Sequence, residues 1–439
     1  MTKNERTTCL VVGGGPAGLV LGLLMARAGV EVTVLEKHAD FLRDFRGDTV
    51  HASTLNLLDE LGLDDRFAAL PQRAMTRAQV QLDCGMARVA DMSRLPGPHK
   101  YIAMVPQWDF LDLIADEAET EPSFTLRRNA EVIGLLRDDG PHSRVAGVRY
   151  RDRTDGSEHE LRASLTIGCD GRGSVVAAEA GLVPRSFGAP MDVWWFRLPR
   201  EQGDPEGGVM RVTSGNFAVL IDRGDYWQAA YLIGKGSDAV LRREGIDAFR
   251  ARLAALVPWL AERLATITSF DDVKLLDVKL NRQRRWAVDG LLLIGDAAHA
   301  MSPVAGVGIN LAVADAVATA RLLAPALRSG GIVPLSMLRA VQRRRWWPTA
   351  LVQAGQRLAH NVLISGPVAV ASSPAGSTAP ASGLLDDNPQ GLARMEDLPL
   401  PLRLLRRFPV LQGIPARIVA IGPLPEHAPA WARRSNARA

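Results

Sequence analysis

A glycine-rich turn near the N-terminus constrains the fold of this chain more than any other feature of its sequence. Residues 13–18 read Gly-Gly-Gly-Pro-Ala-Gly and match the pattern G-x-G-x-x-G. They follow a continuous apolar run at 9–12, typical of a parallel strand buried on both faces, and they precede helix-type spacing over 16–28. A second apolar strand at 30–35 follows. This order predicts a Rossmann-like strand–helix–strand unit at the start of an α/β fold.

Each position of this turn has a physical role in binding a dinucleotide. Gly13 permits the sharp turn, Gly15 leaves room for a pyrophosphate beside the backbone, and Gly18 lets the helix pack closely on the strand. The helix that opens at Pro16 and Ala17 presents unpaired N–H groups and the positive end of its dipole to the phosphates. The turn is therefore predicted to be a nucleotide phosphate site.

Glu36 indicates how the sugar of the nucleotide is bound. It lies 18 residues after Gly18, close to the usual offset of about 20, and it can accept hydrogen bonds from ribose hydroxyls. Its charge would repel a 2′-phosphate, which argues against NADP at this site. Glu36 does not by itself distinguish FAD from NAD.

Two later segments indicate that the nucleotide is a flavin. Each is an apolar strand that ends in an acidic residue beside glycine: residues 166–174 contain Asp170, and residues 291–299 contain Gly295 and Asp296. Carboxylates at the carboxyl ends of parallel strands lie where open α/β sheets bind ligands, so they can accept hydrogen bonds from sugar-alcohol hydroxyls. His299 ends the second segment, and we interpret it as a structural hydrogen-bonding residue of the turn.

The loop after the second segment is suited to a flat ring. Pro303 and Gly306 are expected near the edge of the ring, and Gly306 and Gly308 free the backbone to approach it. A helix then opens, and the N–H groups of Ile309 and Asn310 would face the electron-rich edge of a flavin.

These three motifs, in this order, resemble the single-component FAD-dependent aromatic hydroxylases of the p-hydroxybenzoate hydroxylase type. The resemblance covers roughly residues 8–360. It implies that Arg46 contacts FAD near its phosphates or ribitol and that Gln107 contacts it from the start of a helix. It also implies that Asp296 holds the ribitol and pyrophosphate region, and that Asp170 lies between FAD and a transient NAD(P)H site.

The resemblance also implies a reaction. NAD(P)H would bind briefly and reduce the flavin, and O₂ would then supply one oxygen atom to an aromatic or polyketide-like small molecule. The absence of a second G-x-G-x-x-G and of a cysteine pair agrees with such a chain. Two alternatives stay open: a flavin-dependent dehydrogenase or reductase for a prenyl or quinone-like substrate, and a flavin-binding protein without catalysis. No catalytic acid or base and no metal site is predicted.

The chain is predicted to contain a discontinuous FAD-binding domain, a strand-rich substrate domain and a helical C-terminal region. The FAD-binding domain is assigned to 1–75, 101–185 and 281–360, the substrate domain to 76–100 and 186–280, and the C-terminal region to 361–439, with a flexible loop at 372–391. Helices are expected at 55–61 with Ser53 as the cap, at 241–256, and from Gly308 to about Leu323 with Pro325 as the stop signal.

Aromatic side chains of the strand-rich domain are candidates for contact with a planar substrate. We single out Trp195, Trp227 and Tyr231, although some of these rings are expected on the buried face of the sheet. The run at 194–199 is similar to a flavin halogenase signature but departs from it at Phe196 and Leu198. We therefore expect an ordinary strand there.

Composition narrows the location and the partners. The formal net charge is +4 with both signs interleaved, which gives no nucleic-acid stripe, and the basic run at 343–345 is expected on a solvated helix face. Three distant cysteines suggest no disulfide framework, and no run reaches the roughly 20 apolar residues of a membrane span. The sequence predicts a cytoplasmic protein and leaves its oligomeric state open.

Overall fold

The larger sheet of the protein contains the dinucleotide unit. The computed structural model describes residues 5–42, 49–82, 85–139, 143–205, 207–213, 216–364 and 400–434. Eight strands form this sheet, and β10 and β9 extend it beyond the path β19-β20-β11-β1-β2-β8. Its strands are β1 (Glu5–Val12), β2 (Val32–Leu35), β8 (Phe124–Arg127), β9 (Ala130–Arg137), β10 (Val145–Asp152), β11 (Glu158–Gly168), β19 (Ala287–Val288) and β20 (Leu291–Leu293).

The central strands of this sheet are parallel, so their carboxyl ends share one edge. β1 lies between β2 and β11, with Cys9 opposite both Val32 and Leu165, and β20 continues the sheet beyond β11. All four residues of β2 and all three of β20 are buried, as the continuous apolar runs predict. The α/β fold class, with its Rossmann-like start and second strand-rich region, is confirmed.

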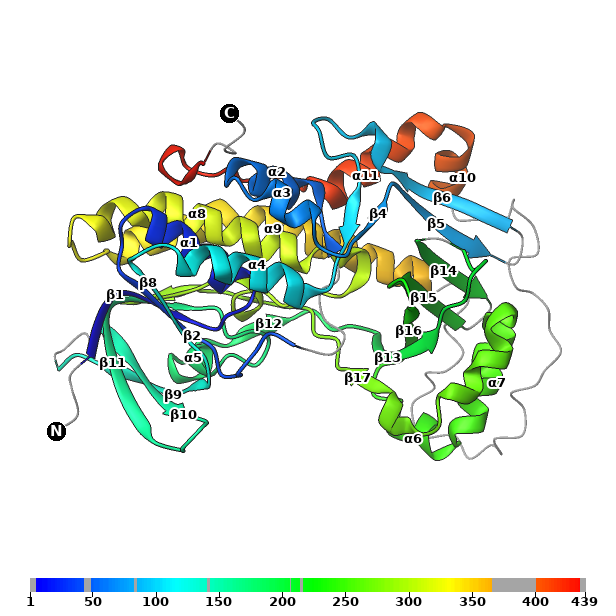
Figure 1. Cartoon of the computed structure of the whole chain (residues 1–439), viewed down its shortest axis with the longest axis horizontal. Coiled ribbons are helices and arrows are strands. Elements are labelled where there is room, and N and C mark those ends of the chain that lie inside the picture. The colour runs from blue at the N-terminus through cyan, green and yellow to red at the C-terminus, as the bar shows by residue number, and fades with distance from the viewer. Residues whose placement is uncertain are drawn as a thin grey trace.

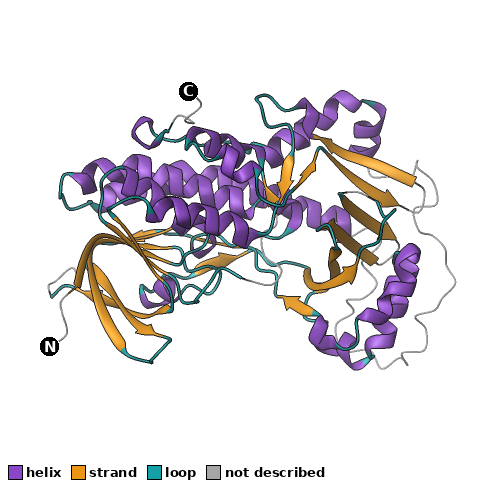
Figure 2. Ribbon diagram, in the orientation of Figure 1, coloured by secondary structure: helices purple, strands orange, loops and turns teal. Residues whose placement is uncertain are grey.

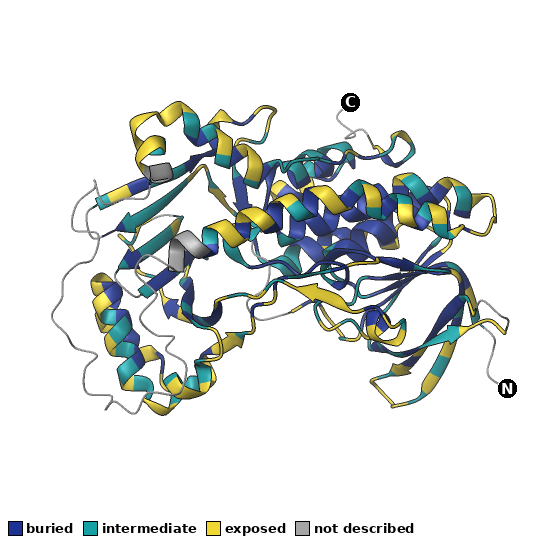
Figure 3. Ribbon diagram, turned by 180° about the vertical axis from the view of Figure 1, so that it is seen from behind, coloured by how far each residue is buried: buried dark blue, intermediate teal, exposed yellow. Residues whose placement is uncertain are grey.

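Long helices cover one face of this sheet (Figures 1 and 2). They are α1 (Pro16–Arg27), α4 (Gln107–Glu119), α8 (Gly308–Arg328) and α9 (Leu335–Ile364). α1 packs against both α4 and α8, and nearly every residue of α1 is buried. Figure 3 shows that α9 is the outer helix, buried along one side and exposed along the other. The part of the sheet formed by β9 and β10 extends away from these helices, and the short helix α5 (Val175–Glu179) lies on the side of the sheet opposite to them (Figure 1).

A second sheet of seven strands has the order β17-β13-β16-β15-β14-β5-β6. Its strands are β5 (Arg77–Leu82), β6 (Gly85–Asp91), β13 (Met191–Pro199), β14 (Gly208–Thr213), β15 (Asn216–Asp222), β16 (Tyr226–Gly234) and β17 (Lys274–Leu276). Two helices, α6 (Asp238–Arg243) and α7 (Ile246–Leu256), and the 3₁₀ segment η2 (Pro258–Thr266) follow β16 in the chain. Residues 77–91 thus pair with strands more than 100 residues away. The division into domains stays a prediction, which these sheet memberships support.

Smaller elements connect the two sheets and the C-terminal segment. β3 (Thr49–Val50), β7 (Ile102–Met104) and β4 (Arg73–Met75) form one small sheet, and β12 (Pro184–Ser186) pairs with β18 (Asn281–Gln283). The remaining helical elements are α2 (Ala52–Glu60), α3 (Asp64–Ala68), α10 (Leu400–Arg407), α11 (Gly413–Ala420), η1 (Met92–Arg94), η3 (Phe270–Asp272), η4 (Gly295–Ala297), η5 (Val304–Gly306), η8 (Pro409–Gln412) and η9 (Ala430–Ala432). The predicted flexible loop at 372–391 lies outside the described residues.

Several local predictions were wrong. α2 begins at Ala52 with His51 at the N-cap, so Ser53 lies inside the helix and does not cap it. The helix predicted over 241–256 is two helices, because Gly245 has a φ of +91° that no helix tolerates. Pro325 does not stop α8: it lies within the last turn, and the helix continues to Arg328 without the hydrogen bond that the missing N–H of Pro325 would donate.

One helix of the described chain is long and apolar enough to cross a membrane. It spans Val304–Arg328, but 72% of its most apolar window is buried inside the protein. That burial is typical of a core helix.

Candidate FAD site at the carboxyl edge of the large sheet

The three glycines of the first motif have different surroundings. Gly13 has a φ of +104°, and a Cβ added there would lie 2.6 Å from the carbonyl oxygen of Cys169. A Cβ on Gly18 would lie 1.9 Å from the carbonyl oxygen of Gly13. Gly15 has nothing within 4 Å of an added Cβ. The protein's own packing therefore requires the first and third glycines, whereas the second borders open space.

That open space lies at the N-terminus of α1. Gly15 is the N-cap residue and Pro16 the first helical residue, and no side chain caps the helix. The first amides of a helix have no intrahelical acceptor, so they are available to donate to an anion. Ala17, in the first turn of α1, has a buried side chain.

Glu36 lies at the end of β2, beside this turn. Its Oε2 accepts a hydrogen bond from the Gly14 amide at 2.9 Å, and its Oε1 accepts one from the His38 amide at 3.0 Å. The carboxylate is thus fixed next to the helix N-terminus.

The second motif adjoins the first through the backbone. The Cys169 amide donates to the Val12 carbonyl at 2.7 Å, which places Asp170 beside Gly13. Oδ2 of Asp170 accepts from the Val176 amide at 3.1 Å, at the start of α5, whereas Oδ1 is buried without a hydrogen-bond partner among the described residues. Burial raises the pKa of Asp170. Oδ1 is an acceptor available to a ligand hydroxyl.

The third motif packs against the first. Gly295 has a φ of +59°, and a Cβ added there would lie 3.1 Å from the Cβ of Ala17. Asp296 is half-buried, and its Oδ2 lies 4.0 Å from Nε of Arg172, which belongs to the second motif. All three motifs therefore meet at one edge of the sheet.

The loop after this turn, residues 303–308, has an unusual backbone, and we call it the positive-φ loop. Ala305 and Gly306 both have positive φ, +66° and +63°. A Cβ on Gly306 would lie 2.3 Å from Oγ1 of Thr49, which donates to the Gly306 carbonyl at 3.1 Å. Pro303 before this pair and Gly308 after it are half-buried, so part of the loop faces outward. Left-handed residues in sequence, held by a side chain from β3, fix the shape of this loop.

The helix that follows the loop presents its N-terminus to the same edge. α8 begins at Gly308, and its N-cap residue Val307 provides no side-chain cap. The side chain of Asn310 is bound to α2, where Thr54 donates to its Oδ1 at 2.5 Å. Ile309 and Asn310 are buried, and their amides lie in the first turn, where amides have no intrahelical acceptor.

His299 has the structural role that the sequence predicts. Its Nε2 lies 2.5 Å from Oδ2 of Asp315, a fully buried carboxylate of α8. The same oxygen accepts from the Gly295 amide at 3.1 Å, and Oδ1 accepts from Nε of Arg345 at 2.9 Å. Burial opposes ionisation of Asp315, but His299 and Arg345 lower its pKa overall.

Comparison with known proteins decides what these motifs belong to. The sequence model of a family described as "FAD binding domain" matches residues 6–354. The chain belongs to this family.

Named relatives are oxygenases. The chain is 34% identical over 365 residues to 6-methylpretetramide 4-monooxygenase of Streptomyces rimosus, and the aligned region covers 78% of this chain and 81% of that protein. It is 27% identical over 364 residues to 3-demethoxyubiquinol 3-hydroxylase of Escherichia coli K12, with 81% and 89% covered. Among solved structures, the anhydrotetracycline hydroxylase OxyS from Streptomyces rimosus matches with a TM-score of 0.71 at 22% identity, over 95% of this chain and 76% of that one. The chain is an FAD-dependent monooxygenase, and NAD(P)H is its electron donor.

Two of the three predicted substrate residues of the enzyme lie in a hydrophobic core. Trp227 is fully buried and Tyr231 nearly so, and both pack with Phe249 of α7 on one face of the second sheet. Their polar atoms are bound to Asp204 and Asn216. The alternation of side chains along a strand sends Trp195 to the other face, with Val193 and Ala230. We therefore retain only Trp195 as a substrate-contact candidate.

Gln107 and Arg46 are the two cofactor residues that only the family resemblance implied, and the structure says less about their positions. Gln107 is half-buried at the start of α4. β7 ends three residues before it, and Met104 of β7 pairs with Thr49, which places Gln107 on the side of the positive-φ loop. Arg46 lies outside the described residues.

Sequence reasoning missed three buried polar residues of the enzyme: His51, Asp315 and Arg345. Arg345 is 1% exposed, so the expectation of a solvated basic run at 343–345 was wrong for this residue. A signal for Asp315 was present, because it is the only charged residue in the apolar run 309–320. An acidic residue in such a run needs a buried partner.

His51 connects the positive-φ loop to the C-terminal segment. It is fully buried; its Nδ1 lies 2.9 Å from the Val419 carbonyl oxygen and its Nε2 3.3 Å from Oγ1 of Thr49. Burial lowers the pKa of His51 to about 4, so the folded enzyme holds it neutral.

This shift predicts acid sensitivity. In the unfolded chain His51 takes up a proton near pH 6.5, but in the folded chain only near pH 4. Its contribution to stability is therefore complete above pH 6.5 and declines as the pH falls toward 4, by about 3 kcal/mol. We expect urea denaturation of His51→Gln to show a smaller loss of stability between pH 7 and pH 4 than the parent, whereas the exposed His427→Gln should keep the full loss. An equal loss in His51→Gln and the parent would contradict this assignment.

Proposed function

We propose that the enzyme hydroxylates a polycyclic aromatic, polyketide-like small molecule with O₂. The observation that carries the proposal is the convergence of three motifs at one sheet edge, in a chain that is 34% identical to a monooxygenase whose name specifies 6-methylpretetramide. The reductase and non-catalytic alternatives lose support, because both named relatives insert oxygen.

The edge of the sheet offers a place for each part of FAD. We place the pyrophosphate over Gly15 at the N-terminus of α1 and the adenosine ribose at Glu36. Asp296 and the buried Oδ1 of Asp170 are acceptors for hydroxyls of the ribitol or of a transient NAD(P)H. The ring system would lie against the loop that contains Pro303 and Gly306.

The residues around the flavin ring would bind and orient FAD and the substrate, and we assign none of them a proton transfer. Bound FAD supplies the redox chemistry that joins NAD(P)H, O₂ and substrate. The amides of Ile309 and Asn310 would stabilise negative charge on a bound flavin, because they open α8 and have no intrahelical acceptor. The Trp195 face of the second sheet is the apolar wall we propose for the substrate, where it would exclude water.

The cellular setting is inferred from the cysteines. Cys9 and Cys169 are free, and Cys9 is buried in β1. This agrees with a reducing compartment, and we propose the cytoplasm.

A coupled assay tests this function. The purified enzyme with FAD is mixed in air with NADH or NADPH, with and without polycyclic aromatic phenols of the polyketide type. We expect such a substrate to accelerate NAD(P)H oxidation and oxygen uptake together, and to gain one oxygen atom by mass. Flavin reduction without oxygen transfer to any aromatic would contradict the proposal, and activity that persists without O₂ would favour the reductase.

A further inference from the structure

The C-terminal segment, residues 413–434, contacts the loops of the FAD site through buried polar groups. This segment lies beyond residue 354, where the family match ends. We propose that it acts as a clamp. It positions two loops at the ring end of FAD, the turn at Gly295 and the loop that contains Gly306, without itself contacting the cofactor. The inference rests on the placement of FAD proposed above.

The first link reaches the positive-φ loop. The Val419 carbonyl, in α11, is bound to Nδ1 of His51, and Nε2 of His51 is next to Thr49. Thr49 donates to the Gly306 carbonyl. Because neutral His51 donates from Nδ1 to Val419 and the Thr49 hydroxyl donates to Gly306, Nε2 and Oγ1 are in contact without a hydrogen bond. The C-terminal segment thus reaches Gly306 through the packing of these two side chains.

The second link reaches the Gly295 turn. Arg345 donates from Nη1 to the Leu424 carbonyl at 3.1 Å, and the same nitrogen lies 3.5 Å from Oε1 of Glu426. Its Nε binds Asp315, which accepts from the Gly295 amide. The side chains of Arg345, Asp315 and Glu426 are all at most 1% exposed. Glu426 is held in turn by Arg344, whose Nε and Nη2 donate to its two oxygens at 2.7 and 2.9 Å.

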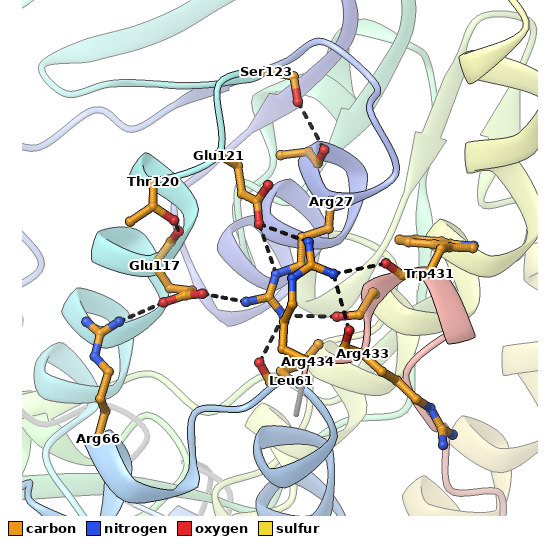
Figure 4. A network of polar contacts seen from close by, with 12 residues as sticks. Arg27, Leu61, Arg66, Glu117, Thr120, Glu121, Ser123, Trp431, Arg433 and Arg434 are labelled. Atoms are coloured by element: carbon orange, nitrogen blue, oxygen red, sulfur yellow. Dashed lines mark hydrogen bonds and ion pairs between the residues drawn. The ribbon is translucent and has the colours of Figure 1, made fainter. Parts of the chain in front are cut away.

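A third contact anchors the end of the segment away from the site (Figure 4). Arg27, at the last position of α1, donates to the carbonyls of Leu61 and Ala432 at 3.0 and 2.9 Å. It is also paired with Glu117 and Glu121 of α4. Figure 4 shows Leu61, Glu117 and Glu121 around the buried guanidinium of Arg27. The segment is thus anchored near its C-terminal end as well as at α11.

These links support a loop whose backbone conformation is strained. Ala305 lies in the left-handed region, where a residue with a side chain is strained, so the surrounding structure must impose this conformation on the loop that contains Gly306. Buried polar chains have discrete geometries, so a lost partner shifts the neighbouring groups rather than being replaced by water. Glu426, Arg345 and His51 are therefore positioning residues for the cofactor.

The test replaces Glu426, which does not contact either loop directly. In Glu426→Gln the shape is kept, Arg344 loses the carboxylate that neutralises it, and Arg345 keeps its ion pair with Asp315 but loses the one with Glu426. We expect the FAD dissociation constant of the deflavinated protein, measured by flavin fluorescence, to rise about tenfold, with a shift of the visible flavin absorption bands. His427→Gln, at the exposed neighbouring position, should leave both unchanged. His51→Gln perturbs the other link and should raise the dissociation constant independently.

The possible results distinguish a failure of the clamp proposal from a failure of the proposed FAD placement. Circular dichroism of each apoprotein establishes that it is folded, and Gly15→Val serves as the reference for lost FAD binding. Native affinity and flavin bands in both Glu426→Gln and His51→Gln, with binding lost in Gly15→Val, would overturn the clamp alone. Native affinity in all three variants would overturn the clamp together with the placement of FAD.

Discussion

Gly15→Val is expected to abolish FAD binding while the apoprotein stays folded. An added side chain at Gly15 meets nothing within 4 Å, and its backbone, with φ −80° and ψ −174°, is one that valine readily adopts. The branched side chain would instead occupy the space proposed for the pyrophosphate, next to the amides that open α1. We expect the FAD dissociation constant to rise at least about 100-fold, which corresponds to about 2.7 kcal/mol.

Two comparisons make this result specific. Gly18→Ala places a methyl group 1.9 Å from the Gly13 carbonyl oxygen, so the apoprotein itself should be destabilised, by about 3 kcal/mol or more. Gly355→Ala, in the interior of α9 with open space around it, should leave FAD binding unchanged and should raise stability by at most about 1 kcal/mol. Circular dichroism and urea denaturation report on the fold, and flavin fluorescence reports on binding. A Gly15→Val protein that purifies with its full yellow colour would contradict the placement of the phosphate site.

Asp315→Asn is expected to cause a large loss of stability. The carboxylate is fully buried and binds His299, Arg345 and the Gly295 amide. Loss of one member of a buried ion pair costs about 3–5 kcal/mol, because the remaining charge is left uncompensated. Since Glu426 remains 3.5 Å from Arg345, we expect a value near the lower end, measured by urea denaturation of the apoprotein at pH 7.

The lowered pKa of Asp315 also predicts how the loss of stability in Asp315→Asn depends on pH. Because the folded-state pKa of Asp315 lies below its ordinary value of 3.8, its contribution is complete above that pH and is lost as the pH falls through the folded-state pKa. The deficit of Asp315→Asn should therefore shrink in acid. Asp247→Asn is the control, because Asp247 forms an exposed ion pair with Arg250 and its loss should cost under about 1 kcal/mol. Equal effects of the two substitutions would show that the buried network contributes little.

Local sequence patterns determined the framework of the FAD site. Apolar runs that end in glycine or an acidic residue predicted β1, β11 and β20, and parallel pairing then required their carboxyl ends to share an edge. The roles of Gly13 and Gly18 were also readable, because positive φ and close helix–strand contact are demands that only glycine meets. These features depend on neighbours in sequence or on the general geometry of parallel sheets.

Only the tertiary structure decided which face of the second sheet each aromatic ring occupies and which charges are buried. Trp227 and Trp195 have the same local character, but α7 covers one face of the sheet and buries the ring of Trp227 there, away from the face that we propose for the substrate. Arg345 reads as part of an exposed basic run, yet Asp315 and Glu426, 30 residues before it and 81 after it, make it a buried residue. Such partners are brought together by packing over long sequence separations, and no local pattern encodes that packing.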